Sequence, residues 1–551
     1  MTVLKSALSF TFYFVILCLV LSFWGRHLLA LLKVENNQKP QMMLQIVAGM
    51  AILLFLGHAI YFYIQNLTFY LIIFFLIGFF GIFIEFYLVK IRSWLKKNNK
   101  ITVIISGLAA KDAWLAAIVI SLVISMFHSA GWPSGTMEGS ANNSFDFHSW
   151  IFMAYHKLGL IDTTNPILTQ RFINDEFDAI GTHILLAFIS IARAQIPLYA
   201  APAIVVTFMV WFGTALYELV RRAFKFKCFQ ALFISIALCL SNLFNYISLH
   251  GMFGHLLFLI LFIITLTNLT KDNSVNLNIK DYILRQFFPF VTLFLAYQSG
   301  YILFSSYIIL FTFILLFQTY KYNLFIRLYK SLYFSLLPLL IISCLSFLLA
   351  PGLAYHLFTR SAEVANQTEG WPLAFFNPLL FSGLPFYLST DQFLTITPAY
   401  KIQIYHYIPL IFITILLTIV LKISYKRTRK NFISNININF ILSLISIFIF
   451  SIVFYLLIFK LYGNNYKIWK YATFTILPLS FIPLSLVILI LYDFFKIKFK
   501  LLPNFTLTII SIYFTYSLFN PSFLLNLKDK YYSIITNHFY LINLYSLNKK
   551  F

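Results

Sequence analysis

Apolar runs of about 20 residues recur along nearly the whole chain, and this repetition limits the possible fold more than any other feature. A helix needs about 20 apolar residues to cross the hydrocarbon core of a bilayer. Of the 551 residues, 61% are hydrophobic and only 10% are charged, whereas soluble domains carry about 25% charged residues. The sequence therefore predicts an all-α, polytopic integral membrane protein surrounded by membrane lipids.

The apolar runs predict about 14 transmembrane helices. The first run follows Lys5 and has no small-x-small cleavage site after it, so we interpret it as a retained span and not as a removed signal peptide. A pair of short runs contains Pro289 and Gly300, and we expect broken or shallow helices there. The predicted spans are residues 8–25, 42–62, 67–89, 108–128, 198–220, 228–247, 251–269, 284–298, 302–318, 332–350, 407–424, 436–458, 471–493 and 504–520.

The basic residues between these spans predict their orientation. Lysine and arginine gather in joints that all lie on one face of the membrane if the spans alternate in direction. The positive-inside rule assigns that face to the cytoplasm, so both chain termini are expected outside. The joints are residues 26–39, 90–100, 221–227, 271–285, 321–330, 422–430 and 496–500.

Two long polar loops then fall on the outer face, and they divide the chain into regions. The predicted order is N-terminal helices 1–128, a first outer loop 129–197, central helices 198–350, a second outer loop 351–406, C-terminal helices 407–520 and an outer tail 521–551.

Several classes of function are disfavoured by composition and by missing motifs. The net charge of +23 comes largely from the short basic joints, without a basic helix or an aromatic-studded basic groove, so we expect no nucleic-acid partner. The four cysteines form no CxxC spacing and imply neither a disulfide framework nor a cysteine metal site. A glycine-rich phosphate loop, GxSxG and HExxH are all missing. No cytoplasmic segment is long enough for a nucleotide-sugar domain, so any sugar donor should arrive as a lipid.

The first outer loop concentrates chemistry-bearing side chains. Six of the 17 acidic residues fall between Glu138 and Asp178, accompanied by histidines. Asp146 stands two residues before His148, at the start of an amphipathic stretch. A carboxylate that is only partly solvated at the membrane surface holds a proton more readily, which suits Asp146 to act as a base. Equally, Asp146 could cap the helix predicted from Phe147, and the two roles are compatible.

An acidic cluster later in this loop has two interpretations. Asp175, Glu176 and Asp178 could bind a divalent cation such as Mg²⁺ or Mn²⁺ through carboxylate oxygens. They could also form a solvated turn that leads into the helix predicted from Gly181, because negative charge is favourable at a helix N-terminus.

Two short apolar stretches of this loop are predicted to be helices lying along the membrane surface. They cover residues 147–160 and 184–191, and neither is long enough to span a bilayer. His183 begins the second stretch. It is either a packed interfacial histidine or, because it shares the loop with Asp146 and His148, a participant in catalysis.

The run from Asp146-Phe-His148, through Gly159 and Asn165-Pro166, to Thr182-His183 resembles GT-C-type membrane glycosyltransferases, which use polyprenyl-phosphate sugars. The resemblance covers about residues 130–195. In that group the corresponding loop follows the first span, whereas about four predicted spans precede it here.

The resemblance implies a GT-C-like fold and an active site on the outer face of a bacterial cytoplasmic membrane. It implies that Asp146 is the catalytic base, assisted by His148 or His183. The donor would be a polyprenyl-phosphate sugar, and the acceptor a glycan or lipid of the cell envelope.

Outer-face cations are candidates for binding the donor phosphate. Lys467 and Lys470 lie beside aromatic residues where the thirteenth predicted span begins. They could pair with a lipid phosphate, or they could be snorkelling interface anchors. GT-C-like proteins often carry a late Tyr/Lys element, which this segment resembles. Further outer cations are Arg171, Arg193, Arg360 and Lys401.

Two rival functions are a surface-polysaccharide polymerase or ligase that uses polyprenyl-linked oligosaccharide, and a non-enzymatic lipid or glycan transporter. A transporter usually places polar groups within its spans. Here the spans are almost free of ionisable residues, and Glu85 and Glu218 near their cytoplasmic ends are expected to be interfacial. The glycines around His255 are expected to allow close helix packing.

Overall fold

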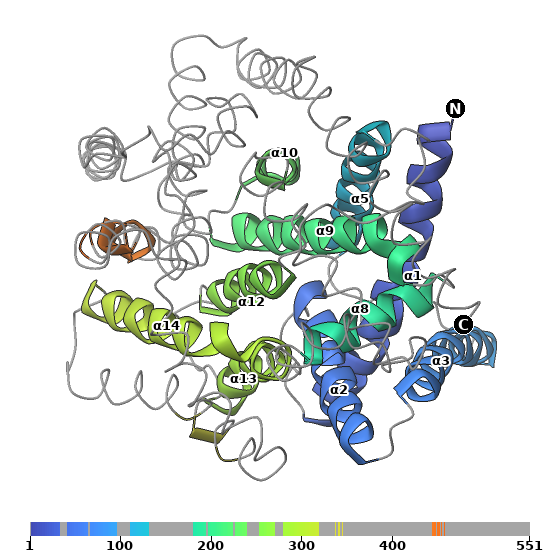
Figure 1. Ribbon diagram of the computed structural model, residues 1–551, viewed down its shortest axis with the longest axis horizontal. Coiled ribbons are helices and arrows are strands. Elements are labelled where there is room, and N and C mark those ends of the chain that lie inside the picture. Colours follow the sequence, from blue (N-terminus) through green and yellow to red (C-terminus); the bar gives the residue numbers. More distant parts are fainter. Residues whose placement is uncertain are drawn as a thin grey trace, which may run out of the picture.

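The computed structural model describes residues 2–32, 41–63, 67–95, 111–131, 180–193, 197–223, 226–239, 253–269 and 279–318, with scattered helical positions at 337–344 and 443–457. Every element in these ranges is an α-helix (Figure 1), which confirms the all-α prediction for this part of the chain. The helices are α1 (Thr2–Leu31), α2 (Met42–Tyr63), α3 (Leu67–Leu95), α5 (Lys111–Gly131), α8 (Ile180–Ala192), α9 (Pro197–Ala223), α10 (Cys228–Cys239), α12 (Phe253–Leu269), α13 (Ile279–Ala296) and α14 (Gln298–Gln318).

Within the described ranges, 5 helices are long and apolar enough to cross a membrane: α1, α2, α3, α5 and α9. This confirms a membrane protein with transmembrane helices. The helix bounds follow the hydropathy prediction closely, as with residues 42–62 and α2. The predicted total of about 14 spans extends into segments outside the described residues and stays a prediction.

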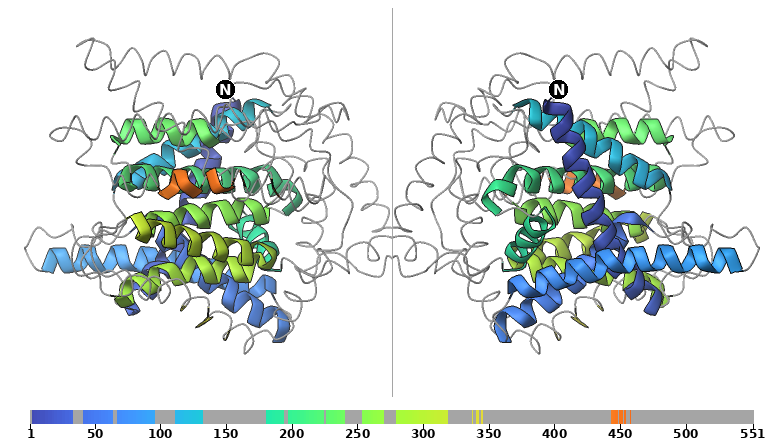
Figure 2. Two further views of the ribbon diagram at one scale, coloured as in Figure 1. Left: turned by 90° about the vertical axis from the view of Figure 1, so that its left-hand side faces the viewer. Right: turned by 90° about the vertical axis from the view of Figure 1, so that its right-hand side faces the viewer.

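The outer surface of α3 is apolar, as expected for a helix that faces lipid. Figure 2 shows α3 extending past the other described helices. Its exposed side chains are bulky and hydrophobic, which would be costly in water but matches the hydrocarbon core of a bilayer. They include Phe69, Ile77, Phe80, Phe83, Phe86 and Tyr87.

Glycines allow α1 and α2 to cross with their backbones in contact. A Cβ atom on Gly25 would collide with the backbone of Gln45, and one on Gly49 would collide with the backbone of Leu21. These pairings run in opposite directions along the two helices, so α1 and α2 are antiparallel. Small residues at such crossings allow the close van der Waals packing that drives helix association in membranes.

Hydroxyl pairs and one ion pair join α5 to its neighbours. The Thr11 and Ser121 hydroxyls are 3.0 Å apart, between α1 and α5. In the first turn of α5, the carboxylate of Asp112 lies 3.4 Å from the guanidinium of Arg221 in α9. Beyond α9, α12 packs on α9 and α13 packs on α12 and α2, so the helices form one continuous bundle.

The helix α13 continues through Pro289 because another helix replaces the lost hydrogen bond. Proline has no N–H to give to the carbonyl four residues earlier, which here belongs to Arg285. The Asn268 side-chain amide of α12 donates to that carbonyl at 3.1 Å. The expected interruption lies instead at Tyr297, the single non-helical residue between α13 and α14.

We expect Asn268→Ala to destabilise the protein by about 1–2 kcal/mol, because it removes the hydrogen bond that the Arg285 carbonyl accepts from the Asn268 amide. In a Pro289→Ala background the residue at 289 supplies an N–H, so the cost of Asn268→Ala should fall toward zero. A double-mutant cycle of unfolding in detergent measures this coupling. Equal costs in both backgrounds would show that Asn268 does not compensate for the proline.

Candidate functional site

The candidate site lies where the first predicted outer loop joins the described helices. This loop leaves α5 at Gly131 and re-enters the described part of the chain at Ile180, the first residue of α8. We call the described elements at the two ends of this loop, together with segments that contact them, the loop end: the start of α1, the end of α5, α8, the start of α12 and the end of α13. Of the predicted site residues, the structure describes His183. The others lie outside the described residues: Asp146, His148, Arg171, Asp175, Glu176, Asp178, Lys467 and Lys470.

The first turn of α8 is docked on the C-terminal end of α13. The Thr182 hydroxyl donates to the Ala296 carbonyl at 2.8 Å, which satisfies one of the carbonyls left without an intrahelical partner at the end of a helix. A Cβ on Gly181 would collide with the backbone of Leu295, so only glycine fits this approach. The residue pair before His183 therefore fixes the point at which the loop returns to the bundle.

Tyr297 occupies the centre of this junction. Its ring fills the space that a side chain at Gly254 or at Gly300 would need, so the two glycines make room for it. The ring centroids of Tyr297 and His255 are 5.8 Å apart. The expectation that glycines near His255 serve close packing is therefore confirmed for Gly254.

Three histidines of the loop end are buried. His183 is 5% exposed, His128 at the end of α5 is 1% exposed and His255 is 4% exposed. His58 of α2, which was not among the predicted site residues, is also 5% exposed. Its Nδ1 atom lies 2.7 Å from the carbonyl oxygen of Leu54.

His58 lies close to the loop end, because its neighbour Gly57 contacts α8. A Cβ on Gly57 would meet the Ile184 side chain at 3.0 Å, one residue beyond His183. A histidine near the end of an apolar span was the available sequence signal for His58. These groups can accept or donate protons, but His183 would meet a substrate only if the substrate entered the packed junction.

The position of α8 differs from the sequence expectation. Residues 184–191 are helical as predicted, but α8 is enclosed by α1, α2, α3, α9 and α13 instead of lying along a surface (Figure 1). Its polar residues Thr182, His183 and Ser190 are each buried. With no charged residue before Arg193, α8 has no strongly polar face to place in water, so burial on every side is favourable.

Arg193 follows the last turn of α8. Its guanidinium carbon lies 5.2 Å from the ring centroid of Tyr13 and 5.8 Å from that of Phe10, both in α1. The two ends of the enclosed helix are thus attached to different partners, the first turn to α13 and the last to α1.

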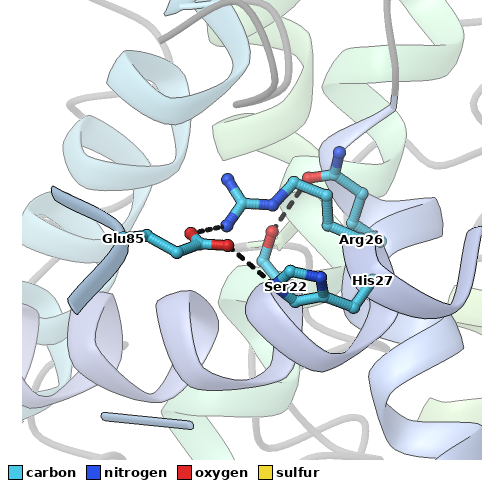
Figure 3. Close-up of polar contacts among 5 residues, drawn as sticks. Ser22, Arg26, His27 and Glu85 are labelled. Atoms are coloured by element: carbon cyan, nitrogen blue, oxygen red, sulfur yellow. Dashed lines mark hydrogen bonds and ion pairs between the residues drawn. The ribbon is translucent and has the colours of Figure 1, made fainter. Parts of the chain in front are cut away.

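Acidic side chains with ion-pair or hydrogen-bond partners lie at the opposite end of α1 and α2. Glu85 of α3 pairs with Arg26 and, at 2.7 Å, with His27 of α1 (Figure 3). Glu218 was expected to be interfacial, but it is 5% exposed. Its carboxylate accepts hydrogen bonds from the backbone N–H groups of Met42 at 2.9 Å and Met43 at 3.3 Å. The first N–H groups of a helix have no intrahelical acceptor, so this buried carboxylate caps α2.

Within the described residues, no group of three or more histidine, cysteine, aspartate or glutamate side chains could hold a metal ion. The predicted cation cluster at Asp175, Glu176 and Asp178 falls outside those residues and stays a prediction. Comparisons with protein-family models, with curated proteins and with solved structures found no match for this chain.

Proposed function

We propose that the chain is a membrane glycosyltransferase that moves a sugar from a polyprenyl-phosphate donor to a glycan or lipid acceptor of the cell envelope. The reaction would take place on the outer face of a bacterial cytoplasmic membrane, at the loop end. The resemblance of residues 130–195 to GT-C-type enzymes motivates the proposal.

In the proposed reaction Asp146 takes the proton from the acceptor hydroxyl as its oxygen attacks the anomeric carbon of the sugar. The bond between that carbon and the phosphate oxygen breaks, and its electron pair leaves with the polyprenyl phosphate. Attack from the opposite face inverts the anomeric configuration. His148 or His183 would orient Asp146 or accept the proton onward.

The departing phosphate needs positive partners at headgroup level. Lys467, Lys470 and Arg171 are the proposed partners, since charge-assisted hydrogen bonds to phosphate are stronger than neutral ones. If Asp175, Glu176 and Asp178 bind Mg²⁺ or Mn²⁺, the cation would add positive charge beside the same phosphate.

One observation supports the location above all others. The segment with Asp146 and His148 is bounded by α5 and α8, and α8 is anchored inside the bundle by Gly181 and Thr182. The end of the loop that precedes α8 is therefore held by the bundle, and His183 is part of its anchored turn. A rigid attachment of this kind helps an active site to hold the reacting groups in a defined geometry.

The proposal is tested by product analysis in proteoliposomes of purified protein that contain a labelled polyprenyl-phosphate sugar. Transfer predicts label in a new glycoside and free polyprenyl phosphate in equal amounts. Label that stays on the polyprenyl lipid while the lipid changes leaflet would contradict transfer.

That second outcome would instead support a non-enzymatic transporter. Two observations favour this function. Glu218 is a buried carboxylate inside a predicted span, and ionisable groups within spans often mark transport pathways. Tyr297 also interrupts two consecutive apolar helices, α13 and α14, a pattern found at transporter binding sites.

A further inference from the structure

Two parallel stripes of side chains run along the first half of α1. Lys5, Ser9 and Tyr13 are spaced four residues apart, so they share one edge of the helix. Lys5 and Ser9 are exposed, and Tyr13 is half-buried. The adjacent stripe is apolar and also exposed, and consists of Leu4 at 50%, Leu8 at 52% and Phe12 at 63%.

Arg193 adds a second positive charge to the polar stripe. Its guanidinium lies over the Tyr13 ring, and its backbone N–H bonds to the carbonyls of Ile189 at 3.3 Å and Ser190 at 3.1 Å. Stacking uses the flat face of a guanidinium, whereas its N–H groups point outward in the plane. The stacking holds the guanidinium beside the polar stripe of α1, where its positive charge can attract an oxyanion.

The depth of these groups matches the headgroup level of a bilayer. The 30 residues of α1 make a helix about 45 Å long, which exceeds the roughly 30 Å hydrocarbon core. Lys5 therefore lies near the membrane surface, and Arg193 can extend toward it from the level of Tyr13. Neither α8 nor the first 13 residues of the chain contain an acidic residue, so no carboxylate within these two segments neutralises Lys5 and Arg193.

We propose that this α1–α8 edge, formed by Lys5, Ser9, Tyr13 and Arg193, binds an anionic phospholipid of the surrounding bilayer. The lipid phosphate lies between Lys5 and Arg193, where Ser9 and Tyr13 can also donate hydrogen bonds. An acyl chain runs along Leu8 and Phe12. Charge complementarity selects an anionic headgroup, and the apolar stripe beside it selects a lipid over free phosphate.

Native mass spectrometry of the full chain in detergent, titrated with phosphatidylglycerol or phosphatidylcholine, tests this. Arg193→Gln should weaken phosphatidylglycerol binding about tenfold, because a charged hydrogen bond to phosphate is lost. Arg193→Lys should have a smaller effect. Binding of phosphatidylcholine should change little in either variant.

Lys111→Gln is the matched control, since Lys111 is exposed at the opposite end of α5 and should leave binding unchanged. Unchanged phosphatidylglycerol affinity in a folded Arg193→Gln variant would overturn the proposal. Binding of a polyprenyl phosphate, but not of phosphatidylglycerol, would overturn it as well. If Arg193→Gln does not fold, Lys5→Gln with Ser9→Ala tests the same edge, because both side chains are exposed.

Discussion

Asp146→Asn should lower the rate of sugar transfer by about 10²- to 10⁴-fold, the usual contribution of a positioned general base. The amide keeps the size and shape of the side chain but cannot take the acceptor proton at neutral pH. The measurement is release of polyprenyl phosphate by purified protein, with thermal unfolding recorded for each variant to show that the fold is intact.

Asp162→Asn is the control for this experiment, because it makes the same chemical change in the same loop at a residue without an assigned role. Its turnover should stay near that of the unsubstituted protein. His148→Gln and His183→Gln should each reduce turnover less than Asp146→Asn, since an assisting group is partly replaceable by water. A fully active, folded Asp146→Asn protein would remove Asp146 from the mechanism.

Gly49→Ala should destabilise the bundle by about 3 kcal/mol or more, although it adds a single methyl group. The new Cβ would collide with the Leu21 backbone, and a backbone cannot rotate away as a side chain can. Thus α1 and α2 must separate, and their hydrogen bond from Ser22 to Gln45, at 2.8 Å, must stretch. Thermal unfolding in detergent, followed by size-exclusion chromatography, measures the effect.

Gly57→Ala, on the same helix, is the matched control. There the added Cβ meets the Ile184 side chain at 3.0 Å and 3.2 Å, and a small rotation of that side chain relieves the contact. Its cost should be below about 1.5 kcal/mol. Equal stability of the two variants would show that α1 and α2 are not in backbone contact at Gly49.

Hydropathy predicted the described helices well because an apolar run must end where the chain meets water. The span predicted at residues 251–269, for example, corresponds to α12 at Phe253–Leu269. Hydropathy could not predict what surrounds a helix. The 13 residues of α8 are compatible with a membrane surface or with a packed interior, and only their contacts with five other helices distinguish these.

The same limit explains why the burial of Glu218 was not predicted. The sequence showed that Glu218 lies near the end of a span, but its hydrogen-bond donor Met42 is 176 residues away in the sequence. Likewise, the role of Asn268 becomes visible only when its amide meets the carbonyl that Pro289 leaves open. For the candidate site, sequence patterns named the loop residues, whereas the structure added the anchoring of α8 and the junction around Tyr297.

Phosphate release coupled to glycoside formation is the most direct test of the glycosyltransferase proposal. Purified protein in nanodiscs would be given a panel of labelled polyprenyl-phosphate sugars with an envelope extract as acceptor. The proposal predicts one free polyprenyl phosphate for each glycoside formed, with the anomeric configuration inverted. Labelled lipid recovered intact from the whole panel, with protein that is folded and lipid-bound, would contradict it.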